Sequence, residues 1–213
     1  MDKAVLFLTG KYLERDTSFY RGLARGCFKV AVDGGWRFFE RSGLIADLLI
    51  GDFDSLRRPR KLSTRTRVLG FPTDKDKTDS ELALDFCLAQ GARRVDIVQP
   101  SMGDPDHFLA NLFLLTRPVG RRRKAALRLV GPTFEAFYVS DGTIRFERAK
   151  GSVVSVIPVS RQILMSCRGT AFDVSRVRIS RGETRPARNR VVAAGASWRV
   201  DGQAFVVRLL GRS

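Results

Sequence analysis

The first 140 residues alternate between short apolar runs and longer segments whose apolar residues recur at helical spacing. A short apolar run bounded by turn-forming residues predicts a strand, and the longer segments predict helices. Repetition of strand, helix and strand is typical of an α/β fold, in which a mostly parallel sheet carries helices on both faces. The expected strands are 5–9, 28–32, 48–50, 68–71, 95–99 and 126–130, and the expected helices are 17–25, 36–42, 78–90 and 106–117.

Two of these helices have recognisable ends. Thr78, followed three residues later by Glu81, predicts a capping box at the start of the helix 78–90, and Gly91 supplies its stop. The helix that begins at Asp106 has a broad apolar face, and Pro118 prevents its continuation. We therefore expect both helices to be well formed.

The helical pattern disappears after Asp141-Gly142. Short β-like runs separated by glycine-containing turns then continue, as in a small antiparallel β-sandwich. We therefore expect two domains, 1–140 and 141–213. The β-like runs are 143–147, 153–158, 171–174, 191–194, 196–200 and 204–209.

The composition limits the class of protein. With 44% hydrophobic residues among 213, the chain can bury a core, and a formal charge of +16 favours polyanionic partners such as nucleotides, nucleic acid or anionic membrane. Near the amino terminus the apolar run is too short for a signal peptide or a membrane span, so we expect a soluble cytoplasmic protein without a membrane partner. The widely spaced Cys27, Cys87 and Cys167 suggest neither a disulfide framework nor a zinc site.

Acidic residues follow four successive expected strands. In an open parallel sheet, ligands collect where the carboxyl ends of strands meet, so these side chains should converge. Clustered carboxylates usually hold a cation, and oxygen-only ligands favour Mg²⁺, which commonly accompanies phosphates. Lysines 75 and 77 and glycines 34, 35 and 51 suit phosphate oxygens. The acidic groups are Asp33, then Asp52 and Asp54, then Asp74, Asp76 and Asp79, and finally Asp104 and Asp106.

Each aspartate taken alone is more simply explained as a turn or helix cap. Their recurrence after four strands favours a magnesium-nucleotide site, although neither a P-loop nor a Gly-x-Gly-x-x-Gly motif is present. His107 is the only histidine, which excludes multi-histidine metal sites. A structural place in the first turn of a helix explains His107 at least as well as a catalytic role does.

Taken together, these motifs resemble the thiamine pyrophosphokinase family. The resemblance covers residues 30–111, and the motifs have the order and spacing of that family. A fainter similarity at 152–158 matches the opening of the family's β-rich thiamine-binding domain. The matching stretches are Asp33-Gly34-Gly35, residues 43–55 with Gly51-Asp52-Phe53-Asp54-Ser55 at their end, residues 75–81, and Asp106-His107 with Asn111.

The resemblance implies transfer of pyrophosphate from ATP to thiamine, which gives thiamine diphosphate and AMP. It implies an α/β nucleotide-binding catalytic domain (1–140), a β-rich acceptor-binding domain (141–213) and a homodimer with active sites at the subunit interface. The implied residues are Asp52, Asp54 and Asp79 for Mg²⁺; Asp33, Gly34, Lys75, Thr78 and Asn111 for the nucleotide; Asp106 and Asp79 in catalysis; and Ser155 and Asn189 for the acceptor. Asp106 would act as a base or orient the accepting hydroxyl.

Two segments depart from the family pattern on the acceptor side. Met102-Gly103-Asp104-Pro105 stands where the family has Gly-Gly-Arg and one further residue, and Arg188-Asn189 replaces a Ser-Asn pair. The exchange of an arginine for Asp104 reverses the local charge. Two alternatives therefore stay open: a pyrophosphokinase for another alcohol, such as a hydroxymethyl-pterin, and a non-catalytic protein that binds nucleotides or nucleic acid. The net charge permits nucleic acid but does not make it the favoured partner.

Overall fold

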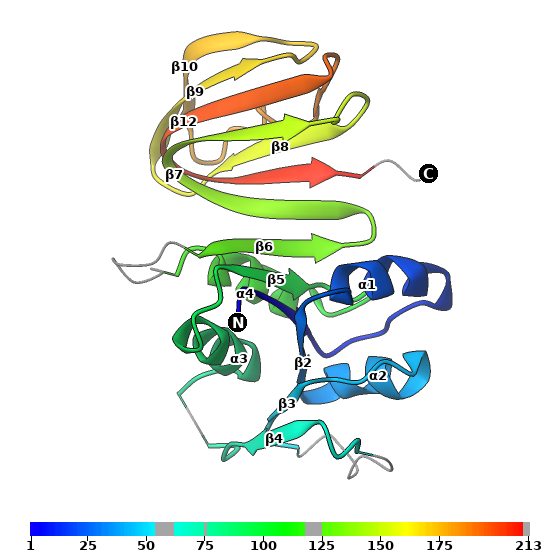
Figure 1. Cartoon of the computed structure of the whole chain (residues 1–213). Helices are drawn as coiled ribbons and strands as arrows, with labels where there is room; N and C mark the ends of the chain where they lie inside the picture. The colour runs from blue at the N-terminus through cyan, green and yellow to red at the C-terminus, as the bar shows by residue number, and fades with distance from the viewer. Residues whose placement is uncertain (54–61, 75, 118–124, 211–213) are drawn as a thin grey trace. The chain divides into compact units, whose positions relative to one another are not determined.

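The computed structural model describes residues 1–53, 62–74, 76–117 and 125–210. The chain divides into two compact units, Met1–Pro132 and Thr133–Ser213 (Figure 1). The expected boundary between residues 140 and 141 instead falls inside a long strand, β7 (Phe134–Glu147). Asp141 lies within this strand, and its carboxylate accepts a 2.7 Å hydrogen bond from the amide of Gly202 on the neighbouring strand.

The first unit contains a parallel sheet in the strand order β6-β5-β1-β2-β3-β4. This confirms the mostly parallel α/β fold. The strands are β1 (Lys3–Phe7), β2 (Phe28–Val32), β3 (Leu48–Gly51), β4 (Arg67–Gly70), β5 (Arg94–Val98) and β6 (Ala126–Gly131). The sheet grows from β1 to β4 in one direction, and β5 and β6 then add on the other side of β1. Adjacent loops therefore diverge at the carboxyl ends of β1 and β5, where open α/β sheets bind ligands.

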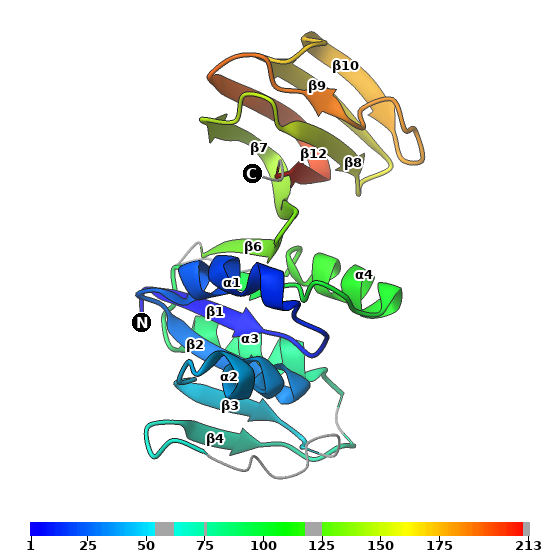
Figure 2. The ribbon, with the colours of Figure 1, turned by 90° about the vertical axis from the view of Figure 1, so that its right-hand side faces the viewer.

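Helices cover both faces of this sheet, as expected. Figure 2 shows α1 and α2 in front of the strands and α3 behind them. The helices are α1 (Thr17–Ala24), α2 (Trp36–Ser42), α3 (Asp79–Ala89) and α4 (Pro105–Leu114), and short 3-10 turns, η1 (Glu14–Asp16) and η2 (Asp33–Gly35), precede α1 and α2. None of the helices in the described ranges is both long and apolar enough to cross a bilayer.

An aromatic cluster joins α1 and α2 to the middle of the sheet. Phe7 of β1 stacks on Phe38 with ring centroids 4.7 Å apart, and it meets Phe39 edge-on at 5.0 Å. Gly35, directly before α2, lies so close to β1 that an added Cβ would collide with the carbonyl oxygen of Phe7. The absence of a side chain at residue 35 therefore sets how closely the start of α2 approaches the sheet.

The second unit is an antiparallel β-sandwich, as the sequence predicts. Its strands are β7, β8 (Val153–Pro158), β9 (Gln162–Arg168), β10 (Val174–Ser180), β11 (Asn189–Arg190) and β12 (Gly195–Leu209). β12 pairs with β7 along nearly its whole length, whereas it pairs with β9 over residues 197–201 and with β8 over 204–209. The change of partner coincides with a bulge between Val200 and Gln203. One strand thus contributes to both layers, as in sandwiches whose strands switch sheets at a bulge.

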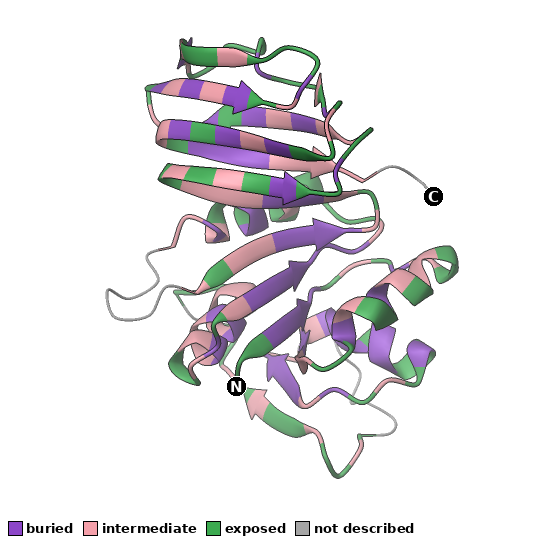
Figure 3. Ribbon diagram, turned by 45° about the horizontal axis from the view of Figure 1, so that its top comes forward, coloured by how far each residue is buried: buried purple, intermediate pink, exposed green. Residues whose placement is uncertain are grey.

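Buried and exposed residues alternate along the strands of this unit, as Figure 3 shows. β9 was not predicted from the sequence, and near β10 the apolar pattern predicted only a strand at 171–174. β10 alternates apolar residues with serine or arginine, and the apolar run of β9 is only three residues long, 163–165. The core between the layers contains Trp198, Phe146, Ile163 and Val206, among others.

Gly35→Ala is expected to lower the free energy of unfolding by about 1–3 kcal/mol, because the added methyl group must displace the backbone of β1. Gly22→Ala is the matched control. Its site in α1 has no atom within 4 Å of a new Cβ, so the same change should stabilise the protein by about 0.5–1 kcal/mol. Urea denaturation measures both. Equal stability of the two variants would show that the contact between residue 35 and β1 is not tight.

Candidate active site

A cavity of about 590 Å³ opens at the carboxyl edge of the parallel sheet. It collects the residues that follow β1, β2 and β3, the first turn of α3 and one side of α4. Five of its side chains are acidic and one is a lysine, in a chain whose overall charge is +16. The polar residues that line it are Thr9, Asp33, Asp52, Thr73, Asp76, Lys77, Thr78, Asp79, Ser80, Glu81, His107 and Asn111.

Close backbone packing places Asp33 at the end of β2. This residue has a left-handed φ of 44°, unusual for a residue with a side chain. The hydroxyl of Thr9, which follows β1, lies 3.4 Å from Asp33 Oδ2 and 3.4 Å from the Val32 carbonyl oxygen. Gly51 ends β3, and a Cβ there would come within 3.1 Å of the Asp33 Cα. The ends of three strands are therefore packed together around this carboxylate.

The amino terminus of α3 forms the second wall. Thr78 is the N-cap, and its hydroxyl oxygen accepts a 3.2 Å hydrogen bond from the amide of Glu81, as the capping-box pattern predicts. Asp79 begins the helix. The amides at a helix start and the positive end of the helix dipole make this turn suitable for phosphate oxygens.

Ion pairs hold α3 against the end of α4. Arg117 pairs with Glu81 and, at 2.9 Å, with Asp85, which also pairs with Lys77 at 2.8 Å. Glu81 and Lys77 themselves line the cavity. Arg117 was not singled out in the sequence, because its partners lie more than thirty residues away and no local pattern identifies them.

Of the residues expected at the start of α4, some line the cavity and one does not. Asn111 is buried and lines the cavity, as does His107. Asp106 does not line it, and its carboxylate accepts a 2.8 Å hydrogen bond from the amide of His107. His107 thus reaches the cavity, a placement that the sequence left open.

The structure therefore brings together Asp33, Asp52, Thr78, Asp79 and Asn111 of the expected site residues. Gly34 lies beside them without lining the cavity, and a Cβ there would meet the side chain of Thr9 at 2.8 Å. Asp54 and Lys75 lie outside the described residues. Thr9 and Thr73 were missed, although Thr9 follows the first strand and could have been found by the rule that located the aspartates.

The donors of this cavity fit a hard cation. Carboxylate, hydroxyl and amide oxygens are the ligands that Mg²⁺ prefers, and Mg²⁺ often takes only one or two carboxylates together with substrate phosphates. Among residues 1–53, 62–74, 76–117 and 125–210, no three His, Cys, Asp or Glu residues are close enough to form a complete metal cage. The donor set therefore suits an ion shared with a bound phosphate better than an ion held by protein alone.

The departure at 102–105 lies outside this cavity. Met102 is 56% exposed and forms an antiparallel bridge with Lys11, with backbone hydrogen bonds of 3.0 and 3.1 Å. Neither Met102 nor Asp104 lines the cavity. The altered loop thus leaves the lining of the acidic cavity unchanged.

The expected acceptor residues lie in the second unit and have structural partners there. Ser155 Oγ accepts a 2.9 Å hydrogen bond from the amide of Arg188. The Asn189 amide group donates to the Phe172 carbonyl oxygen at 2.9 Å and to the Thr170 hydroxyl at 3.0 Å. These bonds fix the loop that carries Phe172, a residue that is 75% exposed.

The same loop is held by Asp173. Its carboxylate accepts hydrogen bonds from the Thr170 amide at 2.8 Å and from the Thr170 hydroxyl at 2.9 Å. These bonds, first of all the one from the backbone amide, lower the pKa of Asp173. The loop around Phe172 is therefore built from side-chain hydrogen bonds at both ends.

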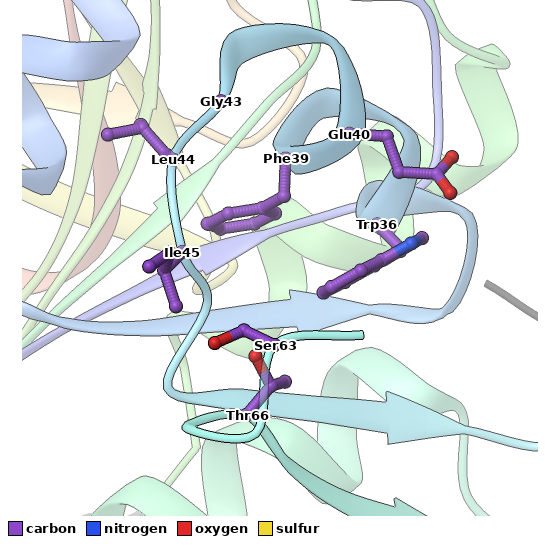
Figure 4. A pocket seen from close by; sticks show the side chains of 8 residues that line it. All are labelled: Trp36, Phe39, Glu40, Gly43, Leu44, Ile45, Ser63 and Thr66. Atoms are coloured by element: carbon purple, nitrogen blue, oxygen red, sulfur yellow. The ribbon is translucent and has the colours of Figure 1, made fainter. Parts of the chain in front are cut away.

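A second hollow, of about 410 Å³, lies beside α2 (Figure 4). Trp36, Phe39 and Ile45 form its apolar wall, and Ser63 and Thr66 lie across from them. Of the described residues that line it, Glu40 alone carries a carboxylate. Its lining lacks the convergent acidic groups of the larger cavity, so we assign the chemistry to the carboxyl edge of the sheet.

Comparison with known proteins gives a consistent result. A family model described as the thiamin pyrophosphokinase catalytic domain matches residues 21–128. The thiamine pyrophosphokinase of Bacillus subtilis (strain 168) is 28% identical over 170 residues, which cover 76% of this chain and 78% of the relative.

Solved structures show the same fold over the whole chain. Thiamine pyrophosphokinase from Bacillus subtilis superposes with a TM-score of 0.82 at 23% identity, covering 99% of this chain and 100% of that chain. The structure from Geobacillus thermodenitrificans gives 0.76 at 25% identity, covering 98% and 99% of the two chains. The enzyme from Candida albicans gives 0.73 at 14% identity, covering 98% and 90%.

Arg117→Met should remove the ion pairs between α3 and α4 while keeping most of the side-chain volume. Because these groups are about one-third exposed or less, we expect a loss of about 1 kcal/mol in the free energy of unfolding. Arg93→Met is the control, since Arg93 pairs with Asp2 and its side chain is 77% exposed. Urea denaturation compares them. A loss no larger for Arg117→Met than for Arg93→Met would show that these ion pairs do not hold α3 against α4.

Proposed function

Since the chain belongs to the thiamine pyrophosphokinase family and is a pyrophosphotransferase, we propose that it transfers pyrophosphate from ATP to the hydroxyl of thiamine in a magnesium-dependent reaction. The products are thiamine diphosphate and AMP. The observation that carries this proposal is the acidic cavity, which gathers Asp33, Asp52, Asp79 and Thr78 at the end of the sheet where a nucleotide is expected to bind.

The nucleotide phosphates are proposed to bind at the first turn of α3. The amides of this turn, the hydroxyls of Thr78 and Ser80 and the ammonium group of Lys77 are donors for phosphate oxygens. Asp33 and Asn111 contribute on the other sides of the cavity, with Gly34 and Lys75 as further nucleotide-side residues. The acidic residues would repel the phosphates unless a cation lay between them.

Asp52, Asp54 and Asp79 are the proposed ligands of Mg²⁺. When bound, Mg²⁺ neutralises charge on the phosphate oxygens and holds the polyphosphate in one geometry. The protein then contributes mainly by positioning the nucleotide phosphates and the acceptor. Asp79 is the first residue of α3, directly after the N-cap Thr78.

In the reaction, the thiamine hydroxyl oxygen forms a bond to the β-phosphorus of ATP. The bond from that phosphorus to the oxygen bridging to the α-phosphate breaks, and AMP leaves with that oxygen. We propose that Asp106 orients the hydroxyl or accepts its proton. His107, the adjacent residue, lines the cavity and is the second group at the start of α4 that can exchange a proton.

For the acceptor, we propose Ser155, Asn189 and the ring of Phe172. Phe172 is 75% exposed yet lies on a hydrogen-bonded loop, so its ring offers a stacking surface for an aromatic substrate. Asn189 would act on the acceptor through the loop that it fixes. An assay with a hydroxymethyl-pterin in place of thiamine tests the alternative acceptor, because AMP should be released only with the true acceptor.

We also propose that the protein is a homodimer. Leu109 and Phe113 lie four residues apart on one side of α4 and are 54% and 53% exposed. Apolar side chains exposed together on a helix commonly pack against a partner. A second copy of the chain is the partner that the family resemblance implies.

Asp52→Asn is expected to reduce formation of thiamine diphosphate and AMP by about 100-fold or more, the scale for loss of one preorganised charged group. Asp104→Asn is the control, because Asp104 is exposed and its side chain makes no capping hydrogen bond. Chromatography of the products after incubation with ATP, Mg²⁺ and thiamine gives both rates. Full activity of Asp52→Asn would contradict the metal assignment.

Phe172→Ala is expected to raise KM for thiamine about 3- to 10-fold, which corresponds to the loss of one aromatic stack. KM for ATP should stay the same. Val192→Ala is the control, since Val192 is 47% exposed and also belongs to the second unit. An unchanged KM for thiamine in Phe172→Ala would remove Phe172 from the acceptor site.

A further inference from the structure

One surface of the β-sandwich carries a group of arginines that the proposed reaction does not use. We call it the arginine face. Its strands are β10, β9, the first half of β12 and the second half of β7, which are neighbours in this order. Its arginines are Arg145, Arg168, Arg176, Arg178 and Arg199, all of them exposed.

Strand alternation shows that these side chains share one side of the layer. Successive residues of a strand point to opposite faces. The neighbours of the arginines, among them Phe146, Cys167, Val177, Ile179 and Trp198, belong to the core between the layers. The arginines therefore point away from that core, and the exposed stripes of the sandwich in Figure 3 follow the same alternation.

The strand register sets arginines beside hydroxyl groups. Ser197 is the direct partner of Arg145 on one side and of Arg168 on the other. Arg199 has Thr143 and Ser166 as its two partners. Neighbouring strands lie ~4.8 Å apart, and alternate residues lie ~6.7 Å apart along a strand. The result is a regular array of positive charges with hydroxyl groups between them.

A bulge in β10 adds a further arginine to this array. The register shifts between Val174 and Val177, and Arg176 takes a left-handed φ of 50°. The amide of Arg176 donates to Ser166 Oγ at 2.8 Å. With Val177 and Ile179 in the core, Arg176 and Arg178 both point outward. An unfavourable backbone conformation for a residue with a side chain is thus kept where it directs an arginine to this face.

Acidic residues do not cancel the charge. Asp201 pairs with Arg199 at 2.8 Å and with Arg176 at 3.5 Å, and alternation places Asp141 and Glu147 of β7 on this face as well. Even when paired, the side chains of Arg176 and Arg199 are 70% and 55% exposed. Five guanidinium groups against these three carboxylates leave a positive surface. Residues 133–213 as a whole hold thirteen arginines and one lysine.

The face lacks an exposed apolar anchor, because Leu164 of β9, the large apolar residue that alternation places on it, is partly buried. The large apolar residues exposed in the described part of the second unit, Ile157, Phe172 and Val192, lie on β8 or in loops and not on these strands. Protein interfaces and membrane-binding surfaces depend on buried aromatic or aliphatic groups. Arginine forks and hydroxyl groups, by contrast, are the usual donors to phosphate oxygens. An extended array fits many phosphates in sequence better than a single one.

We propose that the arginine face binds the phosphate backbone of a nucleic acid without reading its bases. This goes beyond pyrophosphate transfer and does not depend on it, because the acidic cavity lies in the other unit. Binding should be electrostatic and therefore steeply dependent on salt. Anionic membrane is disfavoured by the missing apolar anchor.

The test uses the full chain and a fluorescein-labelled single-stranded RNA of mixed sequence, with anisotropy measured from about 50 to about 200 mM salt. The variant combines Arg145→Gln, Arg168→Gln and Arg178→Gln. The control combines Arg15→Gln, Arg25→Gln and Arg65→Gln, which removes the same charge from exposed positions of the first unit. Thermal melting checks that both variants are folded. A third variant, which combines Arg145→Lys, Arg168→Lys and Arg178→Lys, keeps the positive charge of the face.

Loss of three phosphate contacts should lower the slope of log K against log salt by about 2. Affinity should fall at least about 10-fold for the face variant, little for the control, and partly recover with lysine. Equal binding by face variant and control would overturn the proposal, since net charge alone would then explain it. So would absence of RNA binding by the unaltered chain, or binding to phosphatidylserine vesicles in place of RNA. A rise in KM for ATP confined to the face variant would instead identify the array as a guide for substrate.

Discussion

The close contact between Gly35 and β1 is the constraint on which the active-site edge of the sheet depends. The turn after β2 can approach the carbonyl of Phe7 only because residue 35 has no side chain. That approach brings Asp33 beside Thr9, and Gly51 allows β3 to end against the same residue. The acidic cavity is therefore a consequence of backbone packing at three strand ends as much as of the acidic residues themselves.

Sequence patterns predicted the parts of the fold that are determined locally. Continuous apolar runs marked the buried parallel strands, and the Thr78 cap with Glu81 marked the start of α3. The rule that strand ends converge predicted that Asp33, Asp52 and Asp79 lie together, and all three line the cavity. These features depend on neighbours in sequence or on one topological rule, which is why they could be predicted.

The remainder depends on partners that are distant in the chain. β10 alternates apolar residues with serine and arginine, and β9 has an apolar run of only three residues, so the pairing of β10 with β9 and of β9 with β12 identifies them as strands. The Asp141-Gly142 pair has the composition of a turn but is held in β7 by the bulge on β12. Arg117 forms ion pairs with residues more than thirty positions away in the chain. Asn189 donates a hydrogen bond to Thr170, in a loop that no short sequence motif identifies. In each case, hydrogen bonds between residues distant in the chain determine the local structure.

The change of partner within β12 also affects the order in which the chain can fold. The first unit is continuous in sequence, and every parallel strand pair of its sheet forms between segments made before residue 133. β12 follows β7, β8 and β9 in the chain and hydrogen-bonds to all three. On the ribosome, the sandwich therefore cannot close until β12 has emerged, whereas the α/β unit can form earlier. Until β12 is synthesised, the edges of β8 and β9 that pair with it have no partner. Unpaired strand edges promote aggregation, so the chain is most prone to aggregate during this interval.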